Sequence, residues 1–224
     1  MEFEEYFCKN NKDKSRKNST VEQDITEAKL SSLYQLIEFI GLERNVVEEG
    51  IFRKPGSKRK ETELLERIDR GEVGEELLEG EFTAHECASV LKKFLANLPE
   101  PLVTTACYKA HLAVAEIQDY ETRLEATQLI LELIPQQYFR LLKDLLFLLN
   151  GVAQRAEENK MTASNLGIMF SNHILSPKHI PPLEQAASQV EVARATTFMI
   201  ENPTQLFTLS DELLAEVEKL ISRR

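Results

Sequence analysis

Apolar residues recur along most of this chain at intervals of three and four positions, which is the spacing of one face of an α-helix. The first run ends at Gly41, a natural helix stop, and consists of Leu30, Leu33, Leu36, Ile37 and Ile40. No stretch of the sequence alternates apolar and polar residues in the way that a half-buried strand does. The pattern therefore predicts an all-α protein.

Glycine and proline residues divide this pattern into separate helices. A second helix is expected to end at Gly71, and Thr83 with Glu86 three positions later forms a capping box for a third helix that Pro99 ends. Further amphipathic stretches cover residues 105–117, 122–134, 136–158, 162–171, 183–201 and 210–221. We expect a single domain, a bundle of roughly eight or nine helices over residues 25–207. A basic, flexible arm (residues 1–24) precedes it and a last helix (residues 208–224) follows.

The charge of the chain limits the partners that it can bind. It holds 27 basic and 37 acidic residues, a net charge of −10 at pH 7, whereas an extended surface for nucleic acid or anionic lipid needs the opposite sign. Residues 9–20 differ, with five basic residues, one acidic residue and no apolar side chain. This arm is expected to be a solvated linker, and a tether for an importin or an anionic membrane is the alternative.

Cysteine usage and hydropathy indicate a soluble intracellular protein. Cys8, Cys87 and Cys107 are odd in number and lack a CxxC or Cys/His spacing, which is typical of reduced thiols and predicts no metal site. The N-terminus lacks an apolar secretory segment, and no stretch approaches the ~18 apolar residues that cross a bilayer. We therefore expect a cytoplasmic protein without a transmembrane segment.

One segment, residues 49–56 (EGIFRKPG), places a single arginine on a turn between helices. Ile51 and Phe52 can anchor that turn in a core, and the Pro55–Gly56 pair bends the backbone after it. Arg53 is then aimed outward, and its planar guanidinium can bridge two phosphate oxygens. An ordinary exposed loop cation is the alternative interpretation.

This turn is the first of three blocks that together resemble the Rho GTPase-activating (RhoGAP) domain. The second block, residues 91–102 (LKKFLANLPEPL), is similar to that family's helix ending in LPEPL. The third, residues 159–170 (NKMTASNLGIMF), is similar to its NKMTxxNLAxxF helix. The blocks occur in the family's order and at its separations, and the resemblance covers about residues 25–207. The turn sequence FRKPGS and the run DLLFLL before the third block are similar to one branch of the family.

The resemblance implies a function and a set of site residues. Arg53 matches the family's arginine finger, which is supplied in trans to a Rho-family small GTPase in its GTP-bound form. That partner provides the GTP and the Mg²⁺, so this chain is expected to need no cofactor of its own. Lys92 and Asn165 match the family's GTPase-binding residues. The residues expected to shape the finger loop and the neighbouring groove are Gly50, Phe52, Gly56 and Pro101.

Two departures from the family's pattern concern the groove. Ala96 stands where the family usually has an arginine, one helical turn after Lys92, and residues 171–173 (SNH) stand where it favours a Gly-Pro pair. Because Arg53 is retained, activation of GTP hydrolysis is the leading expectation. The alternative is a GTPase-binding scaffold with little catalytic activity, since a change at position 96 would disturb the finger. A weaker third alternative is a nucleic-acid or nuclear-import role for the basic arm and the FRKPGSKRK patch.

Overall fold

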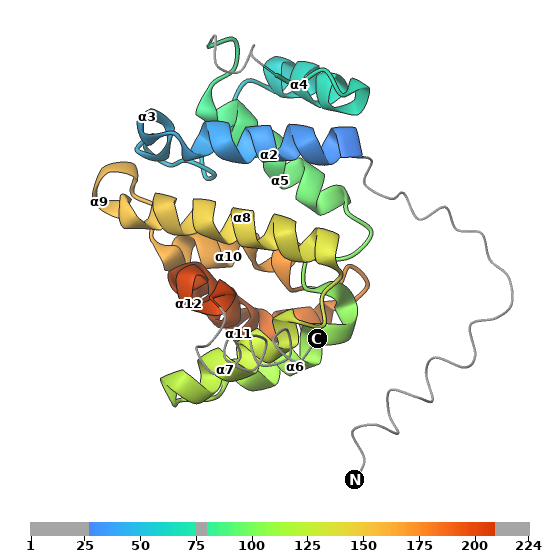
Figure 1. The fold of residues 1–224 in the computed structure, drawn as a ribbon, viewed down its shortest axis with the longest axis vertical. Helices are drawn as coiled ribbons and strands as arrows, with labels where there is room; N and C mark the ends of the chain where they lie inside the picture. The colour runs from blue at the N-terminus through green and yellow to red at the C-terminus, as the bar shows by residue number, and fades with distance from the viewer. Residues whose placement is uncertain (1–26, 75–79, 209–224) are drawn as a thin grey trace, which may run out of the picture.

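The computed structural model describes residues 27–74 and 80–208, and all regular elements in these two ranges are helices. They are labelled α2 to α12 in Figure 1. The all-α class is therefore confirmed. The basic arm at residues 1–24 and the expected helix at residues 210–221 lie outside the described residues.

Eight of the described helices have twelve or more residues, in agreement with the expected eight or nine. They are α2 (Glu27–Gly41), α4 (Lys58–Arg70), α5 (Ala84–Asn97), α6 (Thr104–Ala115), α7 (Tyr120–Leu131), α8 (Gln136–Gln154), α10 (Ala163–Ile174) and α11 (Pro182–Glu201). The short helices of four or five residues are α3 (Glu43–Val46), α9 (Ala156–Asn159) and α12 (Pro203–Phe207).

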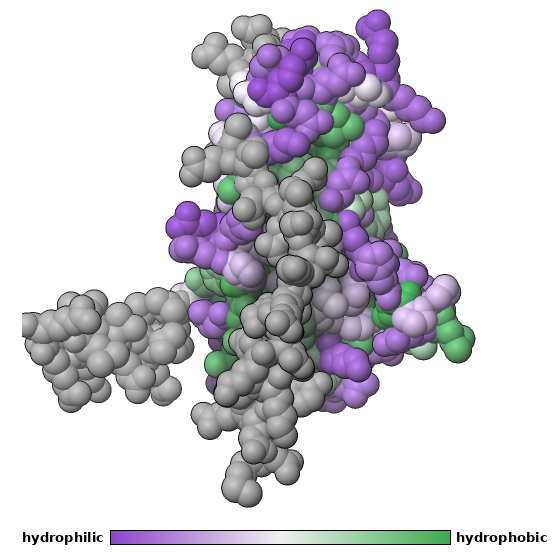
Figure 2. Space-filling view, turned by 90° about the vertical axis from the view of Figure 1, so that its right-hand side faces the viewer, coloured by the Kyte–Doolittle hydropathy of each residue, from purple (hydrophilic) through white to green (hydrophobic). Residues whose placement is uncertain are grey.

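Helix α8 runs through the middle of the bundle and packs against α2, α10, α11 and α12 (Figure 1). Its apolar residues recur at helical spacing, and six of them are completely buried, namely Leu141, Leu142, Leu145, Leu146, Leu149 and Val152. Helices α4 and α5 pack on each other and on α2 at one end of the molecule. Figure 2 shows that hydrophilic residues cover most of that end on the face in view.

The helix ends follow the local sequence at most of the predicted positions. Thr83 and Glu86 form the predicted capping box of α5, and Gly71 ends α4 in the left-handed conformation at φ 70°. One end differs from expectation. The helix predicted over residues 136–158 breaks at Arg155, where φ is −101° and ψ is 23°, and α9 starts anew. After α11, Pro203 begins the short α12, because a proline at the first helical position loses no hydrogen bond.

Cys87 and Cys107 are both buried and free, as expected for reduced thiols. Burial raises the pKa of the Cys87 thiol to about 12, so this side chain stays protonated and acts as a small core residue. Among residues 27–74 and 80–208, none of the helices combines the length and the apolar content that a bilayer span requires.

Candidate functional site

The Arg53 turn (residues 49–56) connects α3 to α4 and is closed by its own backbone. The amides of Arg53 and Lys54 both donate to the carbonyl of Gly50, each at 2.8 Å. Two residues adopt the left-handed region, Gly50 at φ 73° and Phe52 at φ 66°. Phe52 is completely buried although it is not a glycine, so the surrounding packing must offset the strain of its backbone. Arg53 follows it on the surface.

Asn159, at the end of α9, holds the start of the turn. Its carbonyl accepts a hydrogen bond from the Gly50 amide at 2.7 Å. Its fully buried side chain donates to the carbonyls of Val46 and Val152, both at 2.7 Å, and accepts from the amide of Met161 at 2.8 Å. Asn159 therefore joins α3, α8 and the loop before α10 directly beneath the turn. Sequence analysis placed it in the third block but did not single it out.

Phe52 is held at both its ring and its carbonyl. Its ring packs edge-on against that of Phe170 on α10, with 5.0 Å between the centroids. Its carbonyl accepts a hydrogen bond from the ammonium group of Lys92 on α5. Burial lowers the pKa of the half-buried Lys92, and the nearby carboxylate of Glu61 opposes that shift. The structure thus places Lys92 against the backbone of the turn itself.

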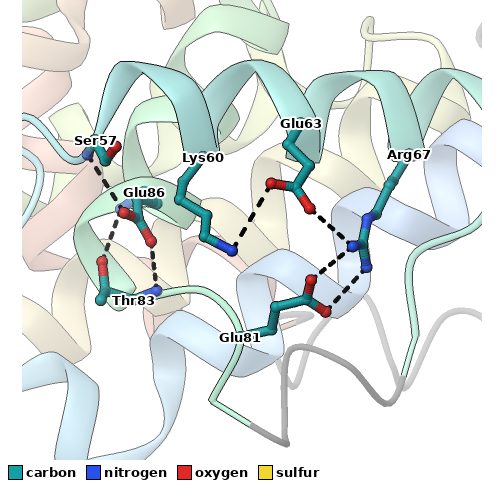
Figure 3. Close-up of polar contacts among 7 residues, drawn as sticks. All are labelled: Ser57, Lys60, Glu63, Arg67, Glu81, Thr83 and Glu86. Carbon is teal, nitrogen blue, oxygen red and sulfur yellow. Dashed lines mark hydrogen bonds and ion pairs between the residues drawn. The ribbon is translucent and has the colours of Figure 1, made fainter.

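Gly56 and Ser57, which follow Arg53, lie against Glu86 in the first turn of α5. A Cβ atom built on Gly56 would lie 2.4 Å from Cγ and 2.8 Å from Cα of Glu86, so any larger residue at this position would clash. The next amide, that of Ser57, donates to Oε1 of Glu86 at 3.3 Å (Figure 3). Gly56 is thus needed for the close approach of the turn to α5.

Arg53 is exposed and has no ion-pair partner among the described residues. Glu49 is the nearest acidic residue in sequence, but its carboxylate binds the ammonium group of Lys54 at 2.8 Å. The hydrogen bond from Lys54 and the charge of Lys54, followed by the smaller effects of the Arg53 and Lys160 charges, lower the pKa of Glu49, and Arg53 itself makes no direct ion pair with it. The guanidinium is therefore left available to an external anion.

Asn165 lies in the first turn of α10. Its amide donates to the hydroxyl of the N-cap residue Thr162 at 3.2 Å. Within the described part of the chain, its side-chain amide is exposed and makes no hydrogen bond. Among the described residues, the Asn165 side chain therefore does not hydrogen-bond to the backbone of its own helix.

Pro101 is buried and lines a pocket of about 250 Å³ at the C-terminal end of α5. Ala96, which departs from the family's arginine, also lines this pocket, and Lys178 donates from its ammonium group to the Ala96 carbonyl at 2.8 Å. His173 connects the pocket to the Arg53 turn, because its ring contacts that of Phe170. Burial first, and then the charges of Lys92 and Lys178, lower the pKa of His173.

Lys93, the neighbour of Lys92 on α5, forms an ion pair with Glu61 of α4. Glu61 is almost completely buried. Burial alone would raise the pKa of its carboxyl, but hydrogen bonds from Lys93, Ser89 and the Gly56 backbone bring it below the ordinary value. The pair fixes α4 on α5 beside the turn, and no local pattern in the sequence indicated it.

We expect Gly56→Ala to lower the free energy of unfolding by roughly 1–3 kcal/mol, because the added methyl group must displace the first turn of α5. Gly74→Ala is the matched control, since a Cβ at Gly74 meets nothing within 4 Å. Urea denaturation of both variants measures the difference. Equal stability of the two variants would contradict the close approach at Gly56.

We expect Asn159→Ala to destabilise the chain by about 2 kcal/mol or more, because it leaves the Val46 carbonyl and the buried Met161 amide without this partner and removes one of the two hydrogen bonds to the Val152 carbonyl. Asn165→Ala removes the same side chain from an exposed position and should change stability by less than about 0.5 kcal/mol. Thermal unfolding followed by circular dichroism compares the pair. A large loss in Asn165→Ala would mean that Asn165 is structural.

Comparison with known proteins gives the same family as the three sequence blocks. A family model described as the RhoGAP domain matches residues 31–179. Rho GTPase-activating protein 19 of Xenopus laevis is 35% identical over 195 residues, covering 82% of this chain and 38% of that protein. Rho GTPase-activating protein gacN of Dictyostelium discoideum is 31% identical over 192 residues, covering 85% of this chain and 31% of that protein. The chain thus spans well under half the length of these relatives.

Two solved structures share the fold. The BH domain from Graf, the GTPase regulator associated with focal adhesion kinase, superimposes with a TM-score of 0.71 at 22% identity, covering 82% of this chain and 96% of that chain. Human Rho GTPase activating protein 15 superimposes with a TM-score of 0.69 at 23% identity, covering 79% and 83%. The similarity of FRKPGS and DLLFLL to one branch agrees with the 35% identity to protein 19. By family model, sequence identity and fold together, the chain belongs to the RhoGAP domain family.

Proposed function

We propose that this chain accelerates GTP hydrolysis by a Rho-family small GTPase in its GTP-bound form, and that it does so by inserting Arg53 in trans. Membership of the RhoGAP family and similarity to several Rho GTPase-activating proteins support the class of activity. The observation that carries the mechanism is the state of Arg53. It is an exposed arginine, without an ion-pair partner among residues 27–74 and 80–208, on a turn whose backbone is fixed on both sides.

The chemistry requires a cation that acts when the bond to the γ-phosphate breaks. Negative charge then develops on the leaving oxygen and on the equatorial oxygens of the transferring group. A guanidinium entering a water-poor site stabilises this charge more than it stabilises bound GTP, which lowers the barrier. Arginine fingers contribute a factor of roughly 10³ to 10⁵ in rate. The GTP and the Mg²⁺ belong to the partner, and Arg53 supplies the missing cation.

The fixed backbone makes this contribution efficient. Gly50 is held by Asn159, the Phe52 ring by Phe170 and the Phe52 carbonyl by Lys92. The turn therefore does not have to be ordered when the partner binds, and only the side chain of Arg53 loses conformational freedom. We assign Lys92 to this positioning of the turn as well as to the surface that receives the partner.

Asn165 is proposed to bind the partner directly. A side-chain amide offers two donors and one acceptor oxygen, and none of these is used within the described part of the chain. The residue lies on α10, the helix that contributes Phe170 to the Arg53 turn. An exposed amide on the helix that supports the Arg53 turn fits a polar contact with the GTPase.

Lys178 is proposed to supply the cation that Ala96 lacks. The α10–α11 connection brings its ammonium group to the backbone of α5 at position 96, at the edge of the pocket lined by Pro101. The groove thus keeps a positive charge at this point, although the charge comes from a different segment. This favours a catalytic activator over the scaffold that the change at position 96 alone would suggest.

We expect Arg53→Ala to lower the rate of GTP hydrolysis at saturating activator by roughly 10³-fold, while the affinity for the GTP-loaded partner changes little. Arg53→Lys should recover only a small part of the rate, because an ammonium group lacks the planar fork. Single-turnover hydrolysis across a panel of Rho-family GTPases measures the rate, and titration of the GTP-loaded partner measures the affinity.

The matched control for this experiment is Arg59→Ala, which removes another exposed arginine six positions away at the start of α4. It should leave the maximal rate unchanged. If Arg53→Ala reaches the wild-type rate at saturation, the finger mechanism is wrong. If the wild type binds a GTPase but accelerates none, the chain is a scaffold.

A second experiment tests the cation at position 178. Lys178→Ala should weaken engagement of the partner by about 0.2–1 kcal/mol, the usual contribution of an exposed charge pair, without changing the maximal rate. The double change Ala96→Arg with Lys178→Ala should restore part of the affinity, since it returns a cation to α5. Affinity unaffected by Lys178→Ala would remove this residue from the interface.

A further inference from the structure

Glu86 makes more contacts than its capping role requires. In the capping box of α5, its Oε2 atom accepts from the Thr83 amide at 2.8 Å, and its own amide donates to the Thr83 hydroxyl at 3.4 Å. A capping box needs only one carboxylate oxygen. The second, Oε1, reaches across to the amide of Ser57, 29 positions away in sequence, immediately after the Arg53 turn (Figure 3).

The first turn of α5 lies at a fixed place relative to α4. Arg67 of α4 binds Glu63 at 2.9 Å and also Glu81, the second residue before Thr83, at 2.6 Å (Figure 3). The ring of Phe82, which lies between Glu81 and Thr83, contacts the charged end groups of Lys60 and Arg67 at 5.1 and 5.3 Å. The chain that leads into α5 is therefore held on the side of α4, and Glu86 is held with it.

The exit of the Arg53 turn is anchored at two successive residues, because the Gly56 backbone hydrogen-bonds to the buried carboxylate of Glu61 and the Ser57 amide hydrogen-bonds to Glu86. Gly56 touches the Cα and amide of Glu86 too closely to accept a Cβ, so the backbone there follows the position of α5. The Ser57 hydroxyl makes no capping hydrogen bond to α4, although Ser57 occupies the N-cap position. The amide of Ser57 and the carboxylate of Glu86 thus link the end of the turn to the bundle.

We infer that Glu86 is a positioning residue for the Arg53 finger, acting through its hydrogen bond from the Ser57 amide. This inference rests on the proposed function, since it assigns a device that sets the direction of Arg53. Asn159 and Lys92 fix the entry and the middle of the turn, and Glu86 fixes its exit. With all three in place, Arg53 leaves the surface in one direction.

The carboxylate is required because two donors point at one group. Each oxygen of Glu86 accepts one backbone N–H, from Ser57 and from Thr83. A glutamine in the same place has one acceptor oxygen, and its NH₂ group would face the second N–H. Glu86→Gln can therefore satisfy the cap or the exit of the turn, but not both.

Three variants separate positioning from helix capping. Glu86→Gln weakens both contacts. Ser57→Pro replaces the Ser57 N–H by a ring carbon and so breaks the bond to Glu86 while leaving the cap at Thr83 in place, at a residue whose φ of −69° already suits proline. Thr83→Ala removes the side-chain half of the capping box and keeps the bond between Glu86 and Ser57. It is the control for the loss of stability that follows from a weaker cap.

The first readout is GTP hydrolysis by the Rho-family GTPase that the wild-type chain activates best. Glu86→Gln and Ser57→Pro should lower the maximal rate roughly 10- to 100-fold, with partner affinity within about threefold, because a misplaced catalytic group costs rate rather than binding. Thr83→Ala should melt at a lower temperature than wild type and keep its maximal rate. A normal maximal rate in Glu86→Gln and Ser57→Pro, or a loss confined to affinity, overturns the inference.

The second readout needs no partner. Backbone hydrogen exchange in the free chain should be faster at Arg53, Lys54 and Ser57 in Glu86→Gln than in Thr83→Ala. Equal exchange in these two variants overturns the inference. If no GTPase is activated by the wild type, the proposed function fails, and the exchange measurement still decides whether Glu86 orders the turn.

Discussion

The arrangement of the site depends on one buried aromatic residue with a left-handed backbone. Phe52 has a φ of 66°, a conformation that costs a non-glycine residue on the order of 1–3 kcal/mol. Complete burial of its ring, the edge-on contact with Phe170 and the hydrogen bond from Lys92 to its carbonyl offset that cost. The reversal of the chain at Phe52 sends the next side chain outward. Because α5 and α10 both contact Phe52, the direction of Arg53 is set by the core of the bundle rather than by the loop.

The cations around the Arg53 turn differ in whether they have a partner within the protein. Three cations close to Arg53 have an internal partner: Lys54 pairs with Glu49, Lys93 with the buried Glu61, and Lys92 with the Phe52 carbonyl. Arg53 remains the exception among these four cations in the described structure. A cation that is already hydrogen-bonded within the protein gains less from an incoming phosphate, because an existing contact must be exchanged. Of these four cations, Arg53 therefore gains the most when it binds an incoming phosphate.

The sequence predicted the elements that local chemistry determines. Periodicity located the long helices, the capping box at Thr83 located the start of α5, and Gly71 located the end of α4. Arg53 was singled out because it lies on a turn between helices, after an apolar pair that can anchor the turn and before the Pro55–Gly56 pair that bends it. The supports of the turn were not predicted. Asn159 bonds a carbonyl 113 positions away, Lys92 one 40 positions away and Glu86 an amide 29 positions away, and no local pattern records such pairs. The break at Arg155, which places Asn159, was missed for the same reason.

The long separation of these partners has a consequence for folding. Closing a loop of over a hundred residues is entropically costly, so contacts of this kind form only when the segments between them are already organised. Asn159 can hold the start of the turn only after α8 has packed and α9 has formed at its end. An assembly of α2, α4 and α5 alone would keep the contacts from Lys92 and Glu86 but would lack Asn159 at the start of the turn and Phe170 against the Phe52 ring. Full support of the arginine is therefore a property of the completed bundle and not of any one part of it.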